Sequence, residues 1–350
     1  MSFFRPNIDK MSAYTPGEQP QEKGFIKLNT NESPYPPSAK VLRAARAAAN
    51  ADLRLYPDPM AGAVRRKAAE VFGTRPERVL VGNGSDDLLT MLFRAAAGPG
   101  RTVAWPTPTY SLYKTLAEIE NAVVRAVPFE EDFSLPKGLF RKGAALTIVA
   151  NPNSPSGTVV GNAALSRLAR AIDGLLVVDE AYVDFAEDNA LRLVEKHRNV
   201  VVLRTFSKSF SLCGVRLGFA VAREEIIEGL TKVKDSYNVN RFAIAAGVAA
   251  LGDIATMRAN ARRIMSTRDR LTAALEVLAW HVYPSRSNFV FARVSGTQSA
   301  RQVYQELKRR KILVRYFDAP GLDDGLRITI GSDREIDALI KELKRMTANG

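Results

Sequence analysis

The sequence predicts an α/β fold: a large domain whose mostly parallel sheet is flanked by helices, followed by a smaller α/β domain. Short apolar runs alternate with helix-like segments up to about residue 240, and such alternation is typical of parallel sheets with right-handed crossovers. The runs at 146–150, 175–178 and 200–203 are almost entirely apolar, as expected of strands buried on both faces. Beyond residue 280 the alternation changes, which indicates a second domain.

Composition is that of an ordinary soluble enzyme. The 350 residues are enough for two domains, and 46% hydrophobic and 25% charged residues are typical of globular proteins. Cys213 is the only cysteine, so no internal disulfide can form and a reducing, cytoplasmic location is expected. With one cysteine and two histidines that lie far apart, the sequence predicts no metal site.

The net charge of +13 raises the question of a polyanionic partner. The densest basic runs, 65–67 and 308–311, lie in helix-like segments among acidic and apolar residues, so we interpret them as solvated helix faces. The first ten residues lack the apolar core of a signal peptide. The longest apolar stretch, 242–251, is too short to span a bilayer. We therefore expect neither a nucleic-acid nor a membrane partner.

The chain begins with an arm and then enters the large domain. Residues 1–37 are rich in proline and polar side chains, which favours an arm over a core element. Ser38 is a suitable N-cap for the first helix. Up to residue 127 the patterns predict helices at 38–49, 63–72, 88–97 and 110–118 and strands at 79–81, 102–105 and 123–127. The glycine-rich turn 82–87 leads from a strand into a helix, where backbone N–H groups can approach an anion.

The remaining elements complete both domains. The patterns predict strands at 146–150, 175–178, 200–203 and 217–221 and helices at 163–172 and 224–240. Residues 241–280 are expected to be helical, and they are followed by strands at 289–292, 313–314 and 326–330 and helices at 298–309 and 335–346. These patterns divide the chain into an arm (1–37), a large domain (38–240) and a small domain (241–350).

Lys208 lies in the polar connection between two apolar strands, 200–203 and 217–221. Burying a lysine there costs desolvation free energy, so a functional role is favoured. A desolvated, neutral amine can attack a carbonyl. The hydroxyls of Thr205 and Ser207 and the guanidinium of Arg216 would suit a phosphate. An amine beside a phosphate site is what pyridoxal phosphate requires. From this segment alone, a solvated surface loop fits equally well.

Several motifs, taken in order, resemble a known family. Ser207-Lys208 followed by Gly214-x-Arg216-x-Gly218 is similar to the lysine signature of fold-type I pyridoxal-phosphate aminotransferases. The further segments that resemble this family, or more narrowly its histidinol-phosphate aminotransferase group, are 28–32, 56–57, 108–110, 153–157, 179–182 and 326–331. The resemblance extends over nearly the whole chain, and it implies that the large domain binds pyridoxal 5'-phosphate and that the arm packs on the small domain and on a partner subunit.

The resemblance implies a role for each residue at the cofactor. Lys208 would hold it covalently and move a proton, Asp179 would face the pyridinium nitrogen, and Tyr182 would hydrogen-bond the ring's phenolic oxygen. Tyr110 would stack on the ring, although an ordinary buried aromatic residue would look the same in the sequence. The implied phosphate contacts are Gly84, Ser85, Asp86, Thr205, Ser207, Arg216 and, from the neighbouring subunit of a homodimer, Tyr56.

One position departs from the family pattern. The asparagine that usually precedes the Pro-Thr-Gly turn and contacts the ring oxygen is replaced by Ser154, with Asn153 one residue earlier. Either Asn153 takes that role through a local shift, or Ser154 takes it more weakly. We favour Asn153.

Substrate recognition is assigned to the late strands and the arm. Arg327 would bind the anionic group of a substrate through its forked guanidinium. Arg315 and Tyr14 are further candidates for a substrate phosphate, and Asn29 is a candidate for closing the pocket. An arginine on a strand is often a surface residue, so both interpretations of Arg315 stay open.

These expectations combine into one hypothesis. The chain would transfer an amino group from L-histidinol phosphate to 2-oxoglutarate, a step of histidine biosynthesis. Alternatives of the same fold are an aromatic-amino-acid aminotransferase and a phosphothreonine decarboxylase, which would break a different bond with the same lysine. A pyridoxal-binding DNA regulator would need a DNA-binding domain, for which the arm is too short. A scaffold without activity is disfavoured by the presence of both Lys208 and Asp179.

Overall fold

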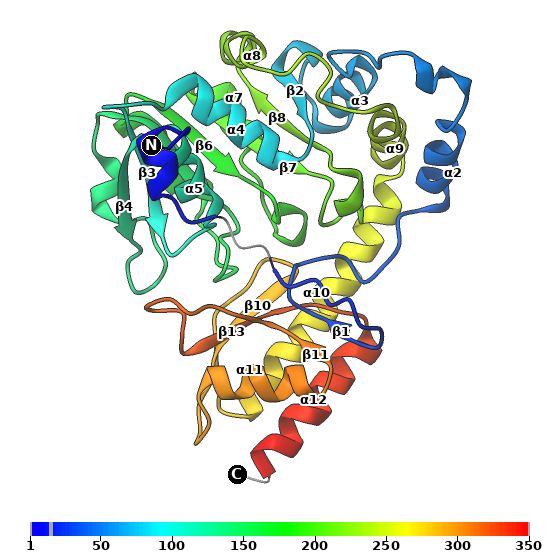
Figure 1. Cartoon of the computed structure of the whole chain (residues 1–350), viewed down its shortest axis with the longest axis vertical. Helices are drawn as coiled ribbons and strands as arrows, with labels where there is room; N and C mark the ends of the chain where they lie inside the picture. The colour runs from blue at the N-terminus through cyan, green and yellow to red at the C-terminus, as the bar shows by residue number, and fades with distance from the viewer. Residues whose placement is uncertain (1, 14–16, 349–350) are drawn as a thin grey trace.

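A computed structural model describes residues 2–13 and 17–348 of the chain. The larger part is built on a seven-stranded sheet and the smaller part on a four-stranded sheet, and helix α10 (Ile254–Val277) runs between them (Figure 1). In spatial order the large sheet contains β2 (Val79–Gly82), β8 (Gly218–Ala222), β7 (Val200–Thr205), β6 (Leu175–Asp179), β5 (Ala144–Ala150), β3 (Thr102–Thr107) and β4 (Val123–Pro128).

Strand direction places polar residues at one edge of this sheet. All neighbouring strands are parallel except β8, which is antiparallel to both β2 and β7, so the predicted mostly parallel sheet is confirmed. Asp179 and Thr205 are the last residues of the neighbouring strands β6 and β7. Gly218 begins β8 at the same edge, since β8 runs in the opposite direction and pairs there with Thr205. Ligands of open parallel sheets bind outside this edge.

The strands are apolar throughout because alternate residues face two different cores. Val200 and Val202 contribute to one core, and Val201 and Leu203 to the other. The first core is covered by α2 (Ala39–Ala47), α3 (Gly62–Phe72), α6 (Asn162–Ala171), α7 (Leu191–Lys196) and α9 (Arg241–Leu251). The second is covered by α4 (Ser85–Ala96), α5 (Leu112–Ile119) and α8 (Glu224–Thr231).

Two expected helices are interrupted. Helix α8 ends at Thr231 instead of continuing to 240, because residues 234–240 (Lys-Asp-Ser-Tyr-Asn-Val-Asn) favour turns. The helical stretch 241–280 breaks after Leu251, and α9 and α10 meet at an angle of 79°. Helix α9 packs into the core of the large sheet through Ala243, Ala246 and Ala250. Residues 241–251, expected to open the small domain, thus pack with the large one.

The small sheet is antiparallel and has its own core. Its order is β12 (Arg315–Tyr316), β13 (Gly325–Thr329), β10 (Phe289–Arg293) and β9 (His281–Val282). Helices α10, α11 (Ala300–Arg309) and α12 (Asp333–Ala348) pack around it (Figure 1). The arm adds β1 (Ile26–Lys27), parallel to β11 (Ile312–Leu313), while α1 (Pro6–Lys10) lies against α5 through Asn7. Two-residue strands are too short to show a period in the sequence.

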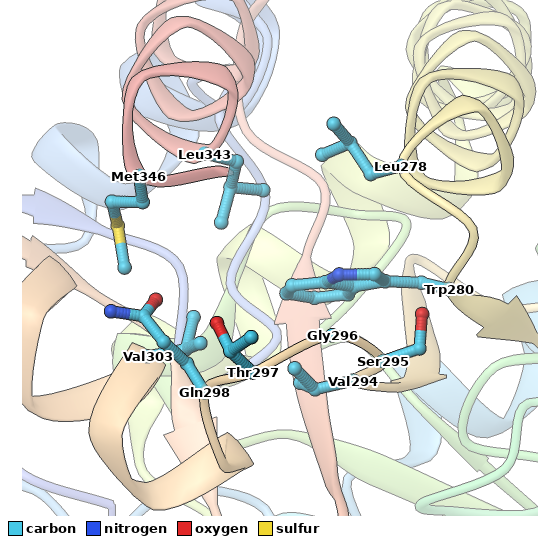
Figure 2. Close-up of a pocket in the computed structure, with 10 residues that line it drawn as sticks. All are labelled: Leu278, Trp280, Val294, Ser295, Gly296, Thr297, Gln298, Val303, Leu343 and Met346. Carbon is cyan, nitrogen blue, oxygen red and sulfur yellow. The ribbon is translucent and has the colours of Figure 1, made fainter. Parts of the chain in front are cut away.

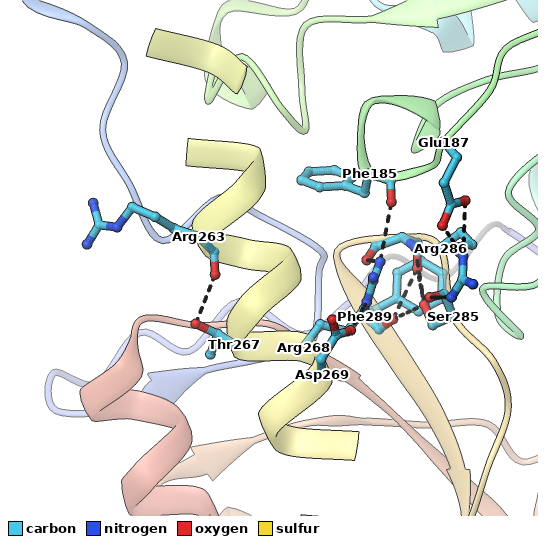
Figure 3. A network of polar contacts seen from close by, with 10 residues as sticks. Phe185, Glu187, Arg263, Thr267, Arg268, Asp269, Ser285, Arg286 and Phe289 are labelled. Carbon is cyan, nitrogen blue, oxygen red and sulfur yellow. Dashed lines mark hydrogen bonds and ion pairs between the residues drawn. The ribbon is translucent and has the colours of Figure 1, made fainter. Parts of the chain in front are cut away.

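Arg268 of α10 joins the two parts of the molecule. This side chain is 5% exposed, and its Nη1 donates to the carbonyl oxygen of Phe185 at 3.3 Å (Figure 3). It also donates to the carbonyl oxygen of Ser287 at 3.3 Å. Phe185 ends the short helix η4 (Val183–Phe185), which follows β6, and Ser287 precedes β10. Nearby, Arg286 forms an ion pair with Glu187 (Figure 3). A buried arginine therefore fixes the turn after Asp179 against the small domain.

None of the helices within residues 2–13 and 17–348 is by itself long and apolar enough to cross a membrane; the bent pair α9 and α10 meets that standard only when both helices are taken together.

Candidate active site

Asp179 lies at the base of the site and is 4% exposed. Its Oδ2 accepts a hydrogen bond from the Tyr113 hydroxyl at 2.7 Å, and its Oδ1 accepts one from the Ala181 N–H at 3.2 Å. Burial raises the pKa of Asp179 to about 6, and the Asp86 carboxylate adds to the rise, whereas the Tyr113 hydrogen bond and the Lys208 ammonium oppose it. A carboxylate in this setting gains most from a cationic partner.

Lys208 projects from the turn after β7 and is half-buried. Its Nζ lies 3.4 Å from the Thr30 carbonyl oxygen and 5.6 Å from the centre of the Tyr182 ring. The ammonium thus lies between the arm and the turn after β6, close enough to Asp179 to influence its pKa. The structure brings together Lys208, Asp179 and Tyr182, the three residues predicted to be catalytic.

The predicted anion site forms where α4 begins. Gly84 has φ +90°, and a Cβ there would lie 2.7 Å from Arg216 Nη2, so only glycine lets the guanidinium approach this closely. A Cβ on Gly218 would lie 2.7 Å from the backbone nitrogen of Ser85. Arg216 itself has φ +57°, a left-handed conformation that non-glycine residues adopt uncommonly. Its Nη2 contacts Asp86 Oδ2 at 3.1 Å.

Hydroxyl groups line the other side of this anion site. Ser207 is buried, and its Oγ accepts hydrogen bonds from Thr205 at 3.0 Å and from Arg216 Nη1 at 3.4 Å. Tyr110 lies beside the site, since its hydroxyl donates to Asp86 Oδ1 at 3.4 Å. Two hydroxyls, a guanidinium and the first turn of a helix provide donors for a phosphate, and the carboxylate of Asp86 holds the guanidinium in place.

Asn153 and Ser154 have different surroundings. The Asn153 amide donates to Pro108 O at 3.1 Å and to Ser156 Oγ at 2.9 Å, and its oxygen accepts from Thr109 at 2.8 Å. The Ser154 hydroxyl accepts instead from Arg327 Nη1 at 3.2 Å. Asn153 is therefore engaged within its own loops, and Ser154 lies next to the predicted substrate arginine.

The predicted substrate residues lie on β12, β13 and the arm. Arg327 Nη2 donates to the Asn29 carbonyl oxygen at 2.9 Å. Arg315 is the direct partner of Arg327 across β12 and β13, and both guanidinium groups lie 5.3–5.4 Å from the centre of the Phe317 ring. Like charges placed opposite each other destabilise a sheet unless an anion joins them. The side chain of Asn29 donates to Glu18 O at 2.8 Å, which holds the arm over this region.

Among the described residues, the predicted Tyr56 does not join this group. Tyr56 is 77% exposed, and its ring stacks on Tyr237 with the centroids 4.4 Å apart. Tyr14 lies outside the described residues.

A buried ion network supports the Lys208 turn and was missed by sequence reasoning. Arg204 is 5% exposed and contacts Glu180 at 3.3 Å and Asp184 at 2.5 Å, and Asp184 accepts a hydrogen bond from Ser209. Burial raises the pKa of Glu180 to about 7, against the effect of Arg204. Arg204 directly follows an apolar run, 200–203, and a charged residue at the end of a buried strand is the feature of the sequence that could have indicated this network.

Sequence reasoning also missed Tyr113 and Asn31. Burial and the Asp179 carboxylate raise the pKa of Tyr113 well above its usual value, so this phenol stays protonated and donates. Asn31 Nδ2 donates to the Tyr182 hydroxyl oxygen at 2.9 Å. In the sequence, Tyr113 looks like an ordinary core residue of α5, so no signal distinguished it. Asn31 could have been found, because it ends a run of polar residues that begins at Asn29.

The small domain also has a hollow far from this site (Figure 2). None of the side chains that line it is ionisable, so it does not offer acid–base chemistry. The lining residues are Leu278, Trp280, Val294, Ser295, Gly296, Thr297, Gln298, Val303, Leu343 and Met346.

Curated relatives match almost the entire chain. A histidinol-phosphate aminotransferase of Rhodopirellula baltica is 47% identical over 345 residues, which is 98% of this chain and 95% of the relative. One of Citrifermentans bemidjiense is 47% identical over 99% of both chains, and one of Trichormus variabilis is 43% identical over 98% of both.

Solved structures agree with these relatives. The histidinol-phosphate aminotransferase of Sinorhizobium meliloti, in complex with pyridoxal-5'-phosphate, superposes with a TM-score of 0.90 at 26% identity, covering 100% of this chain and 98% of the other. The Clostridium acetobutylicum enzyme of the same name has a TM-score of 0.85 at 19% identity, over 93% of this chain and 100% of the other, and supports the fold alone. The model of the family "aminotransferase class I and II" matches residues 23–343. The chain thus belongs to the class I and II aminotransferase family, has its fold-type I architecture and is an aminotransferase.

Proposed function

We propose that this protein transfers the amino group of L-histidinol phosphate to 2-oxoglutarate with pyridoxal 5'-phosphate as cofactor, forming imidazole-acetol phosphate and L-glutamate in histidine biosynthesis. The observation that carries the proposal is 43–47% identity, over nearly the full length, to histidinol-phosphate aminotransferases. We propose a cytoplasmic location, in keeping with the lone Cys213. Nucleic acids and membranes are not partners in this proposal.

The residues at the sheet edge fit this cofactor. Its phosphate matches the donors around Arg216, and its ring nitrogen, when protonated, matches the buried Asp179 carboxylate. Pyridoxal phosphate, when bound, supplies an aldehyde that takes up the amino group and a ring that accepts the electron pair of the substrate α-carbon.

Five side chains would act at or behind that ring. Lys208 would hold the cofactor through its Nζ, and its free amine would move the proton of the substrate α-carbon. Asp179 would stabilise a proton on the ring nitrogen, and Tyr113 holds the Asp179 carboxylate by its 2.7 Å hydrogen bond. Tyr182 would donate its hydroxyl proton to the ring oxygen, and Tyr110 would pack on the ring face.

The phosphate is bound by the backbone and side chains at the start of α4 and after β7. Gly84, Ser85 and Asp86 contribute backbone N–H groups, and the hydroxyls of Thr205 and Ser207 add two donors. Arg216, which now contacts Asp86, would neutralise part of the charge of the phosphate.

The arginine pair on β12 and β13 binds the anionic groups of both substrates. Arg327 presents two N–H groups between Asn29 and Ser154, and Arg315 lies directly opposite across the strands. Histidinol phosphate carries a phosphate and 2-oxoglutarate carries carboxylates, so one cationic surface serves both halves of the reaction. Asn29 and Tyr14 are the proposed additional contacts on the arm side.

A substrate panel tests the proposed activity. The protein is offered histidinol phosphate, phenylalanine, aspartate and phosphothreonine in turn with 2-oxoglutarate, and glutamate and carbon dioxide are both measured. The proposal predicts a kcat/KM for histidinol phosphate at least about tenfold above the others, without carbon dioxide. Preference for phenylalanine, or release of carbon dioxide from phosphothreonine, contradicts it and favours one of the two competitors.

We further propose that the working unit is a homodimer. Exposed apolar side chains lie on the α2 helix, on the segment around η1 (Ala51–Arg54) and at the start of α9; they are Leu42, Leu53, Leu55, Tyr56, Tyr237 and Phe242. Helix α2 packs on α9 and Tyr56 stacks on Tyr237, so these residues share one side of the large domain (Figure 1). A second copy is the occupant we propose, with Tyr56 reaching the cofactor phosphate of the other subunit.

Sedimentation of the protein and of Leu53→Glu tests the dimer. We expect a dimer for the wild type and a shift toward monomer for the variant, since a buried carboxylate disfavours the interface. Tyr56→Phe should remain dimeric and bind the cofactor more weakly. A monomeric wild type, or a Leu53→Glu variant that dimerises as tightly as the wild type, contradicts the proposed interface.

A further inference from the structure

Asn31 is a buried residue of the arm that the proposed mechanism does not yet use. It is 2% exposed and has φ +56°, a left-handed conformation that asparagine tolerates better than most residues. The loop that carries it lies against the small domain, since Leu28 belongs to the small core and Tyr35 packs against it, and Asn31 also reaches Tyr182 after β6.

Four hydrogen bonds fix Asn31 and the orientation of its side chain. Its backbone N–H donates to Thr329 Oγ1 at 2.9 Å, and its carbonyl oxygen accepts from Asn288 Nδ2 at 3.0 Å. Its Oδ1 accepts the hydroxyl proton of Thr329 at 3.0 Å, so its Nδ2 faces the Tyr182 hydroxyl oxygen at 2.9 Å. Tyr182 accepts here and keeps its own proton for another acceptor.

The same contacts connect Tyr182 to the strand that carries the substrate arginine. Thr329 and Arg327 are two residues apart on β13 and so lie on one face of the small sheet. Phe289 packs edge-on against Tyr182 with the ring centroids 5.0 Å apart, and the Arg327 guanidinium lies 5.3 Å from the Phe289 ring. Two contact paths, one through Asn31 and one through Phe289, therefore connect β13 and its Arg327 to Tyr182.

We propose that Asn31 is a positioning residue that directs the Tyr182 proton toward the cofactor ring oxygen and makes that hydrogen bond respond to an anion at Arg327. The proposal rests on the function proposed above. An N–H donated to the phenol oxygen makes the phenol a stronger donor, because hydrogen bonds in a chain polarise one another. A stronger donor stabilises negative charge on the ring oxygen, and that charge is greatest when the linked Lys208 nitrogen has lost its proton.

The pH dependence of the absorption spectrum of the cofactor-loaded protein tests the proposal. Asn31→Asp has the same shape but offers only acceptors, so Tyr182 must give its proton to the new carboxylate. We expect the midpoint of the spectral titration to rise by about one pH unit, the size expected when one charge-assisted hydrogen bond is lost. Thr329→Ser keeps the hydroxyl and should leave the midpoint unchanged.

A double-variant cycle separates positioning from the added charge. Tyr182→Phe should raise the midpoint by a similar amount, and adding Asn31→Asp to Tyr182→Phe should raise it no further. A shift of equal size in both backgrounds means that Asn31→Asp acts by charge alone and overturns the proposal. If Asn31→Asp does not fold, Thr329→Val, which removes the hydroxyl that orients the amide, must raise the midpoint, and an unchanged midpoint overturns the proposal.

Inorganic phosphate tests the link to Arg327. We expect saturating phosphate to move the midpoint of the wild type and of Thr329→Ser, and to move that of Asn31→Asp at most half as far. Equal movement in all three overturns the coupling. A wild type without any cofactor absorption would count against the proposed function itself, whereas a normal spectrum that Asn31→Asp leaves unchanged counts against the role of Asn31 alone.

Discussion

The edge of the large sheet and the face of the small domain contribute to the site in different ways. At the sheet edge, Asp179, Thr205 and Ser207 are at most 7% exposed and lie at or just after the ends of neighbouring strands. On the small-domain side, Arg327 and Arg315 are only half-buried, and Arg327 makes its contacts to the arm and to the turn at Ser154. The proposed covalent chemistry thus involves residues at the sheet edge. The proposed substrate binding involves residues whose positions depend on how the arm, the Ser154 turn and β13 meet.

Substitutions in the two regions should therefore have different effects on catalysis. A change at the sheet edge should reduce the rate of the chemical step far more than substrate binding. A change on the small-domain side should weaken the binding of anionic substrates and leave the cofactor in place.

Lys208→Ala should have the largest effect. Loss of the amine removes both the covalent attachment and the proton transfer, so kcat should fall by roughly four orders of magnitude, about 5 kcal/mol in barrier. Steady-state rates of glutamate formation measure it. The exposed Lys232 on the same domain is a matched control, and Lys232→Ala should be unaffected. Turnover by Lys208→Ala close to that of the wild type would remove Lys208 from the mechanism.

Asp179→Asn should have the second largest effect on activity and an opposite effect on stability. Without the carboxylate the ring nitrogen loses its proton, and kcat should fall by several kcal/mol in barrier, which is measured as above. Near-normal turnover would contradict the role of Asp179.

The stability of the cofactor-free protein should depend on pH through the same residue. The pKa of Asp179 is raised from 3.8 to about 6, so the folded state binds the proton more tightly than the unfolded state. Ionising the buried Asp179 carboxyl therefore lowers the free energy of unfolding. This loss is absent below about pH 4, grows as the pH rises to 6, and reaches about 3 kcal/mol above it. Cofactor-free Asp179→Asn should therefore be more stable than the wild type at pH 8, with the difference fading near pH 4. Denaturant unfolding at both values measures this, and equal stabilities at pH 8 would contradict it.

Arg327→Gln should have an effect confined to substrate binding. Loss of the fork should raise the KM for histidinol phosphate and 2-oxoglutarate by about a hundredfold, close to 3 kcal/mol, with cofactor affinity unchanged. Arg334→Gln, at an exposed position on α12, is the matched control. Equal losses of substrate and cofactor affinity would mean that Arg327 supports the fold of the site.

Ser154→Ala and Asn153→Ala should have the smallest effects of these variants. If Ser154 supports substrate binding through its hydrogen bond from Arg327, Ser154→Ala should raise the KM by about threefold to tenfold, since that hydrogen bond is lost. Asn153→Ala should lower the thermal stability, because its amide joins the loops at Pro108 and Ser156. A larger loss of cofactor affinity in Asn153→Ala than in Ser154→Ala would support the prediction from the sequence that Asn153 contacts the ring oxygen.

The two regions also differ in how far sequence reasoning could describe them. Lys208, Asp179 and Tyr182 follow strands that were apparent from apolar runs, and the direction of parallel strands was enough to place them at one edge. The break between α9 and α10 and the pairing of β1 with β11 depend on tertiary packing, which no local pattern encodes. Tyr113 and Asn31 act through contacts over 66 and 151 residues of sequence, so only the folded chain shows them.

One measurement tests the central claim, that the amine of Lys208 holds pyridoxal phosphate at the sheet edge opposite Asp179. The cofactor-loaded protein is reduced with borohydride, digested, and its peptides are sequenced by mass spectrometry. We expect one reduced pyridoxyl group per chain, on the peptide that contains Lys208. A group found on a different lysine, or no modification of a protein that was yellow before reduction, would contradict the account.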